Sequence, residues 1–141
     1  MNQRGFATLE VILMVMVIGI LASIAIPRFT DITTQANTAK IQADLATIDT
    51  AISVYTMDGT NTALTTSSKI SDLKDYLRDA ENIKPPTGKC YINGDEKDIP
   101  ANSKYAIASV GTETDAELRA VLAIDGNKTA GDFTKFKSAT E

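Results

Sequence analysis

The chain has no histidine, no tryptophan and a single cysteine, Cys90, among its 141 residues. Without histidine there is no Ser-His-Asp catalytic set. Without a second cysteine there is no intramolecular disulfide and no paired-cysteine metal site. The chain also lacks a glycine-rich phosphate-binding loop. These absences predict a protein that is not an enzyme and that carries no cofactor.

Cys90 lies in a segment, residues 89–93, whose composition is typical of a β-strand. A buried thiol that packs as a small apolar side chain is the expected state of this cysteine. An intermolecular disulfide and a reactive thiol are the alternatives.

Basic residues are outnumbered, with 14 Lys and Arg against 18 Asp and Glu. Without Arg4, Glu10 and Arg28 these counts become 12 and 17, so the part after the N-terminal block has a net charge of −5. An acidic surface repels phosphate backbones. The composition therefore predicts no direct binding to nucleic acid.

Charge is absent from residues 11–27, whose sequence is VILMVMVIGILASIAIP. From residue 6 to residue 27 the only charged side chain is that of Glu10. A helix rises about 1.5 Å per residue, so this stretch is long enough to cross a hydrocarbon layer of about 30 Å. Leu, Ile and Val occupy 11 positions between Leu9 and Ile26, which favours insertion into a membrane.

Two ordinary kinds of segment also have this hydropathy. A cleaved signal peptide is one, because Ser23-Ile24-Ala25 offers small residues at a suitable spacing. Its positive region would be minimal, since Arg4 is the only basic residue before the apolar run. A plain membrane anchor is the other, but it leaves the acidic residue Glu10 unexplained.

The segment Arg4-Gly5-Phe6-Ala7-Thr8-Leu9-Glu10, followed by the apolar run, resembles the class III signal of type IV pilins and type II secretion pseudopilins. The resemblance covers residues 1–55. It implies that prepilin peptidase cuts between Gly5 and Phe6 and N-methylates Phe6. It also implies that Glu10, the fifth residue after the cut, sets the register of assembly. Gly19 and Pro27 fall where the helix of this family loosens in filaments.

The resemblance implies three parts: a leader peptide of residues 1–5, a transmembrane and filament-core helix of residues 6–28, and a pilin globular domain of residues 29–141. The implied function is that of a structural subunit of a type IV pilus-like filament in a prokaryote. The implied partners are further copies of the chain, other pilins, prepilin peptidase, a membrane platform protein and an assembly ATPase. The precursor would lie in the cytoplasmic membrane and the assembled protein on the cell surface.

Glu10 has a physical reason to take part in assembly. A carboxylate in an apolar span is costly unless it is paired, and such residues usually mark function. Cleavage before Phe6 would free a cationic amine, which the Glu10 carboxylate of a neighbouring subunit can pair with in a medium of low dielectric constant. We therefore expect this pairing to reward the correct axial register.

Helical periodicity continues beyond Pro27 to a stop signal at Asp58-Gly59, which predicts one helix over residues 7–55 with a bend at the proline. A membrane anchor followed by a separate helix is the alternative. Two apolar stripes follow the helical period. One contains Phe29, Ile32, Ala36 and Ala39, and the other contains Ile41, Leu45, Ile48, Ile52 and Tyr55.

The sequence after the long helix predicts a short helix over residues 70–80 and strands over 89–93, 104–110 and 118–124. The last segment has an alternative, because a capping-box pattern at 114–117 favours a helix over 115–124. A single antiparallel sheet of three or four strands, packed on the amphipathic half of the long helix, is expected. The predicted class is α+β with a pilin-like fold.

Two weaker patterns lie near the C-terminus. Asp125, Asn127 and Asp132 space oxygen atoms as in a calcium loop, but a solvated turn explains them as well. Asn127-Lys128-Thr129 is a short glycosylation sequon of a kind that arises often by chance.

The task of such a subunit is left open among adhesion, motility, DNA uptake and secretion. Within the family, the lack of tryptophan argues against the major pseudopilin of type II secretion. The lack of a C-terminal cysteine pair argues against many Gram-negative major pilins. A minor pilin, a competence or secretion pseudopilin, and an anchored or secreted binding module that forms no filament are the alternatives.

Overall fold

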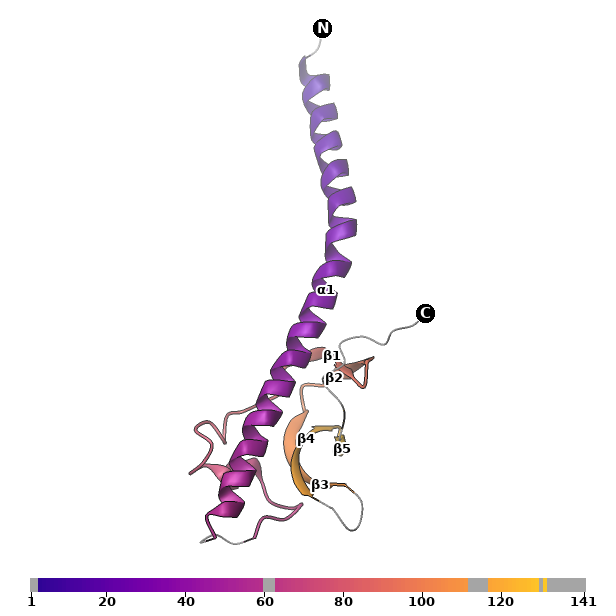
Figure 1. The fold of residues 1–141 in the computed structure, drawn as a ribbon. Helices are drawn as coiled ribbons and strands as arrows, with labels where there is room; N and C mark the ends of the chain where they lie inside the picture. The colour runs from indigo at the N-terminus through magenta and orange to yellow at the C-terminus, as the bar shows by residue number, and fades with distance from the viewer. Residues whose placement is uncertain (1–2, 60–62, 112–116, 130, 132–141) are drawn as a thin grey trace. The chain divides into compact units, whose positions relative to one another are not determined.

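The computed structural model describes residues 3–59, 63–111, 117–129 and 131. In these residues it has a long helix, α1 (Gln3–Met57), and a short 3-10 helix, η1 (Ile70–Leu73). Five strands follow: β1 (Gly88–Ile92), β2 (Asp95–Ile99), β3 (Lys104–Val110), β4 (Glu117–Ile124) and β5 (Asn127–Thr129) (Figure 1). The chain divides into two compact units, Met1–Thr33 and Thr34–Glu141. The predicted α+β class is confirmed.

Helix α1 begins before the predicted residue 7 and ends at the predicted stop signal. Asp58 donates its N–H to the Val54 carbonyl at 3.1 Å, and Gly59 adopts a φ of 63°, which ends the helix. The backbone is helical through Pro27, although proline has no N–H to donate to the Ser23 carbonyl. The prediction of one continuous helix is confirmed.

One of the two apolar stripes forms the core of the globular unit. Ile41 and Ile48 are fully buried, Ile52 is 4% exposed, and Leu45 and Tyr55 pack at the edge of the same cluster. The other stripe is exposed: Phe29 and Ile32 lie in the first unit, and Ala36 and Ala39 begin the second. Upstream of Ile41 the buried positions are instead polar ones, Thr34 and Thr38.

The predicted helix over residues 70–80 is wrong in type. Ile70–Leu73 forms a single 3-10 turn, and separate turns follow it to residue 82. The N–H groups of Tyr76 and Leu77 both donate to the Leu73 carbonyl. One bond spans three residues and the other four, so the segment mixes 3-10 and α-helical turns. Its apolar side chains are nevertheless buried as expected, because single turns suffice to bring Ile70, Leu73 and Leu77 into the core.

The expected single sheet is also wrong, because the structure has two sheets. Strands β1 and β2 form an antiparallel hairpin, and β3, β4 and β5 form an antiparallel sheet in that order. Figure 1 shows both beside the globular half of α1. The strand β4 excludes the helical alternative for residues 117–124; residues 112–116 lie outside the described ones.

Strand β2 was missed because four of its five residues are charged. The signal for it lies in the preceding turn, Asn93-Gly94, whose φ values of 57° and 91° suit a two-residue hairpin loop. Asp125-Gly126 joins β4 to β5 in the same way, with φ values of 48° and 82°. Both turns place asparagine or aspartate before glycine, the pair that tolerates positive φ best.

Cys90, on β1, is fully buried and forms no disulfide. Burial raises the pKa of its thiol to about 11, because a thiolate is poorly solvated in the core. The expectation of a buried thiol is confirmed.

The raised pKa predicts slow alkylation of Cys90 by iodoacetamide in the folded chain. Since the thiolate is the nucleophile, moving the pKa from 9.0 to about 11 lowers the reactive fraction at pH 8 about 100-fold. The rate should rise about tenfold per pH unit until the pH approaches that value. Mass spectrometry measures the alkylation rate for the chain in detergent and for the urea-unfolded chain. Equal alkylation rates in both states would contradict the burial of Cys90.

Ile48→Ala should lower the free energy of unfolding of the globular unit by about 2–5 kcal/mol, because it leaves a cavity in the core. Val54→Ala is the matched control on the same helix. Because Val54 is 45% exposed, this substitution should lower the free energy of unfolding by well under about 1 kcal/mol. Urea unfolding of the full chain in detergent, followed by tyrosine fluorescence, measures both. Similar losses for the two variants would show that the stripe does not form the core.

Candidate functional site

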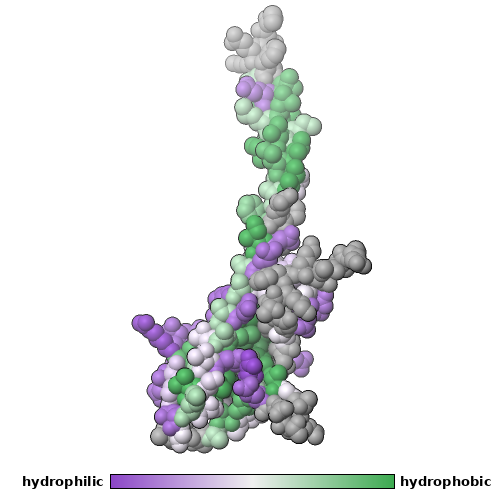
Figure 2. Space-filling model, in the orientation of Figure 1, coloured by the Kyte–Doolittle hydropathy of each residue, from purple (hydrophilic) through white to green (hydrophobic). Residues whose placement is uncertain are grey.

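Residues 7–25 of α1 form a helix that is long and apolar enough to cross a membrane. None of this span is buried in the described chain, whereas the core helix of a soluble protein is mostly buried. Its large apolar side chains are all more than half exposed, from Leu13 at 53% to Ile18 at 64%. Figure 2 shows the hydrophobic colouring of this segment. A signal sequence has the same length and composition, so the span alone does not distinguish the two.

Glu10 lies near the start of this span with its side chain exposed. It lines a groove along one side of the helix together with Leu13, Met14, Val17 and Ile18. These positions follow the spacing i, i+3, i+4, i+7 and i+8, which places them on one helix face. A carboxylate therefore sits at the N-terminal end of an otherwise apolar surface.

The other predicted positions of the N-terminal region are placed by backbone only or lie in open surroundings. Gly5, Phe6 and Pro27 are helical, and the side chains of Phe6 and Pro27 lie outside the described ones. Gly19 is helical, and a Cβ added there would meet nothing within 4 Å. Packing within the described chain therefore does not require a glycine at position 19. Bending at Gly19 and Pro27 stays a prediction.

Hydroxyl side chains in the span form hydrogen bonds to their own helix. Ser23 Oγ donates to the Ile20 carbonyl at 2.7 Å. Just beyond the span, Thr33 Oγ1 donates to the Phe29 carbonyl at 2.9 Å. Such local bonds satisfy polar groups that apolar surroundings would otherwise leave unpaired.

The globular half of α1 attaches to strand β1 through two polar side chains. Thr38 Oγ1 accepts the Tyr91 N–H at 2.8 Å and donates to the Thr34 carbonyl at 2.7 Å. Asn37 Nδ2 donates to the Lys89 carbonyl at 2.9 Å. Thr38 is fully buried, so its hydroxyl replaces a backbone partner that the edge of β1 would otherwise lack.

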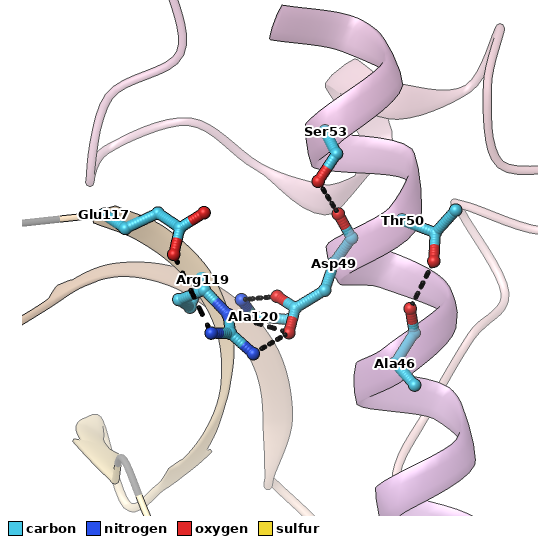
Figure 3. Close-up of polar contacts among 7 residues, drawn as sticks. All are labelled: Ala46, Asp49, Thr50, Ser53, Glu117, Arg119 and Ala120. Carbon is cyan, nitrogen blue, oxygen red and sulfur yellow. Dashed lines mark hydrogen bonds and ion pairs between the residues drawn. The ribbon is translucent and has the colours of Figure 1, made fainter.

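Strand β4 is attached by Asp49 (Figure 3). Its Oδ1 accepts the Ala120 N–H at 2.6 Å, and its Oδ2 accepts from Arg119 Nε at 3.0 Å. Arg119 also lies 3.8 Å from Glu117. One carboxylate thus joins a helix turn to both the backbone and a side chain of β4.

Strand β3 is attached one helical turn away. Tyr105 OH donates to Asp44 Oδ2 at 2.6 Å, and Lys40 Nζ pairs with the same oxygen at 2.5 Å. Burial and the hydrogen bond to Asp44 raise the pKa of Tyr105 above its usual value. The phenol therefore stays protonated and keeps donating throughout the physiological pH range.

The sequence is similar to those of known pilins and pseudopilins. A 57-residue match with the type IV narrow pilus major component PilA5 of Thermus thermophilus is 40% identical and covers 40% of the chain and 49% of that relative. A type IV major alpha-pilin of Moraxella bovis is 24% identical over 94% of the chain and 84% of its own length. The type II secretion system core protein G of Escherichia coli is 27% identical over 78% of the chain and 74% of its own length. The relatives of the present chain are thus type IV pilins and type II secretion pseudopilins.

The resemblance predicted from the N-terminal residues is therefore confirmed. The match to PilA5 spans about half of that relative's length. No protein-family model and no solved structure matches the chain. Pilins and pseudopilins are structural proteins rather than enzymes, which agrees with the prediction of a non-catalytic chain.

The residues that attach this pilin-like chain's helix to its sheets were missed in the sequence. Thr34 and Thr38 precede Ile41 and Leu45 at the spacing of the buried stripe, so periodicity alone identifies their face. Their burial was not expected because they are polar, and a buried threonine hydroxyl needs a hydrogen-bond partner that only the distant strand supplies. Asp49 offers no local signal, since its partners lie 70 and 71 residues away along the chain.

The calcium-like loop is in part a hairpin turn. Asp125 Oδ1 accepts from Asn102 Nδ2 at 3.0 Å, and Asn127 begins β5. Asp132 lies outside the described residues. Among the residues that are described, no cluster of three acidic, histidine or cysteine side chains is suited to a metal. Asn127 is exposed, and its glycosylation stays a prediction.

Asp49→Ala should lower the free energy of unfolding by about 1–3 kcal/mol, because it leaves the Ala120 N–H without its acceptor. Arg119→Ala should cost no more than about 1 kcal/mol, since Arg119 is half exposed and water screens its ion pair. Urea unfolding of the two single variants and of the double variant measures these losses of free energy. A larger loss for Arg119→Ala than for Asp49→Ala would show that the ion pair, and not the backbone bond, holds β4.

Proposed function

We propose that the chain is a prepilin, made as a membrane-inserted precursor, cut after Gly5, N-methylated at Phe6 and polymerised through α1 into a type IV pilus-like filament. The observation that carries this proposal is an unburied apolar helix of membrane-spanning length with the carboxylate of Glu10 near its N-terminal end. The pilin and pseudopilin relatives support it. In this proposal residues 1–5 are the leader, residues 6–28 the membrane and filament-core helix, and residues 29–141 the globular domain.

Helix packing would provide the energy for polymerisation. The apolar side chains of the span are exposed on the single chain, and lipid or other copies of the same helix can cover them. A water-exposed surface of this kind is unfavourable at about 25 cal/mol per Å². The span therefore passes from lipid to the filament core without an intervening stage in water. The partners of this route are prepilin peptidase, a platform protein, an assembly ATPase and other pilins.

Glu10 would supply the register that apolar packing lacks. Apolar side chains on all sides of a helix tolerate sliding, because one contact replaces another of similar energy. Opposite charges 4 Å apart attract by about 4 kcal/mol at an effective dielectric constant of 20. A shift by one turn would separate the Glu10 carboxylate from the Phe6 amine of its neighbour by about 5 Å more. The charged pair thus favours one alignment.

Mass spectrometry of the chain isolated from its own cells tests the processing. We expect a mature N-terminus at Phe6 that carries one added methyl group. A terminus near Ile26 would identify a cleaved signal peptide and overturn the proposal. An intact Met1 together with an absence of surface filaments would favour a plain membrane anchor.

Glu10→Gln tests the register separately, because it removes the charge and keeps the shape. We expect normal processing and at least about a tenfold loss of sheared surface filaments, which corresponds to about 1.4 kcal/mol or more per subunit contact. Glu10→Asp keeps the charge with a shorter reach and should assemble better than Glu10→Gln. Asp31→Asn, an equal charge change at an exposed position beyond the span, is the control and should assemble normally. Normal filaments from processed Glu10→Gln would exclude the register role.

A secretion pseudopilin is the second candidate, because the match to protein G of E. coli extends over about three quarters of both chains. A deletion strain distinguishes the two. Loss of surface filaments with secretion intact identifies a pilus subunit. Loss of secreted proteins with filaments intact identifies a pseudopilin.

A further inference from the structure

The globular unit contains a cavity of about 730 Å³ that assembly through the N-terminal helix does not use. Three segments of the chain line it: residues 66–70, residues 81–84 and residues 101–106, the last of which lead into and begin β3. Its volume lies within the range of about 300–1,000 Å³ found for small-molecule sites.

Positive charge converges on this cavity. Each of the three lining segments contributes one lysine: Lys69, Lys84 and Lys104. None of the three ammonium groups forms an ion pair with a described residue. Glu81 is the one carboxylate among the lining residues. In a chain with a net charge of −4, this cavity is a local site of attraction for anions.

Ser103 adds a polar group that the fold itself does not satisfy. The residue is 7% exposed and lines the cavity, and its buried Oγ has no hydrogen-bond partner in the described part of the chain. Its N–H donates to the Pro100 carbonyl at 3.0 Å, which fixes the turn before β3. Buried hydroxyls are normally paired, so an unpaired one beside a cavity indicates a ligand or water position.

We propose that this cavity binds an acidic sugar, that is, a sugar-sized molecule with one carboxylate or phosphate group among several hydroxyls. The lysines pair with the acidic group, and the hydroxyls of Ser103 and Ser67 bond to those of the sugar. Ile70 and Ile83, which also line the cavity, contact the apolar faces of the ring. A long polyanion is disfavoured, because the acidic surface outside the cavity repels it. This site is independent of the proposed filament role.

Calorimetric titration of the full chain in a zwitterionic detergent tests the ligand class. The probes are glucuronate, glucose 6-phosphate and glucose, which share a ring and differ in the acidic group. We expect at least one acid to bind about tenfold or more tightly than glucose. The preferred acid tells whether the site takes a carboxylate or a phosphate. No binding of either acid, or equal binding of all three probes, overturns the proposal.

Substitutions then test the residues. Lys69→Gln and Lys104→Gln should each weaken binding of the preferred acid about fivefold or more and leave binding of glucose unchanged. Glu81→Gln should strengthen binding of the acid. Lys97→Gln is the matched control, since Lys97 is exposed on β2 and does not line the cavity. An equal loss in Lys97→Gln and Lys104→Gln would show that only the overall charge matters and overturn the site.

Ser103→Ala separates binding from folding. The change removes an unpaired buried hydroxyl, so the chain should be at least as stable as the parent. Binding of the acid should nevertheless weaken about fivefold. A destabilised Ser103→Ala chain with unchanged binding would show that the hydroxyl serves the fold and not a ligand.

Discussion

Burial of one stripe of α1 holds the globular unit together. Ile41, Ile48 and Ile52 lie in one cluster with residues of η1 and of both sheets. An isolated two-stranded hairpin is at best marginally stable in water, and packing against a helix is one way to stabilise it. Because the stripe occupies the C-terminal half of the helix alone, the first half takes no part in this core.

The same helix therefore carries two different kinds of surface. A helix satisfies its backbone hydrogen bonds internally, so α1 continues from the globular unit into the apolar span without needing strands or loops as partners. Only its side chains change, from a buried stripe with polar neighbours to apolar residues on every side. In the proposed filament subunit, this change lets one helix join a water-exposed domain to a lipid or filament environment.

Polar side chains, not further apolar ones, position the sheets on α1. Thr38 pairs with the backbone of β1, Asp49 with that of β4, and Asp44 with the Tyr105 hydroxyl of β3. Apolar contacts are non-directional, whereas each hydrogen bond requires one alignment. The helix thus sets the position of each sheet at a defined turn.

Local patterns predicted much of the fold. The helix, its stop signal at Asp58-Gly59 and the strands β1 and β3 follow from periodicity and turn residues, whereas the segment of β4 was open between strand and helix. The helix expected over residues 70–80 became a 3-10 turn, because three apolar side chains can reach the core from single turns. Strand β2 was missed, because backbone pairing with β1 and not its charged side chains makes it a strand.

The sequence by itself determined that residues 7–25 form an unburied apolar helix with one carboxylate, and residues 4–10 carried the resemblance to pilins and pseudopilins. Those properties depend on neighbours within a few turns, so a linear pattern carries them. Only the tertiary structure decided which side chains attach α1 to the sheets and that three lysines meet at one cavity. Thr38 and Tyr91 are 53 residues apart, and Asp49 and Ala120 are 71 apart. Partners so distant in sequence leave no local pattern, because folding alone brings them together.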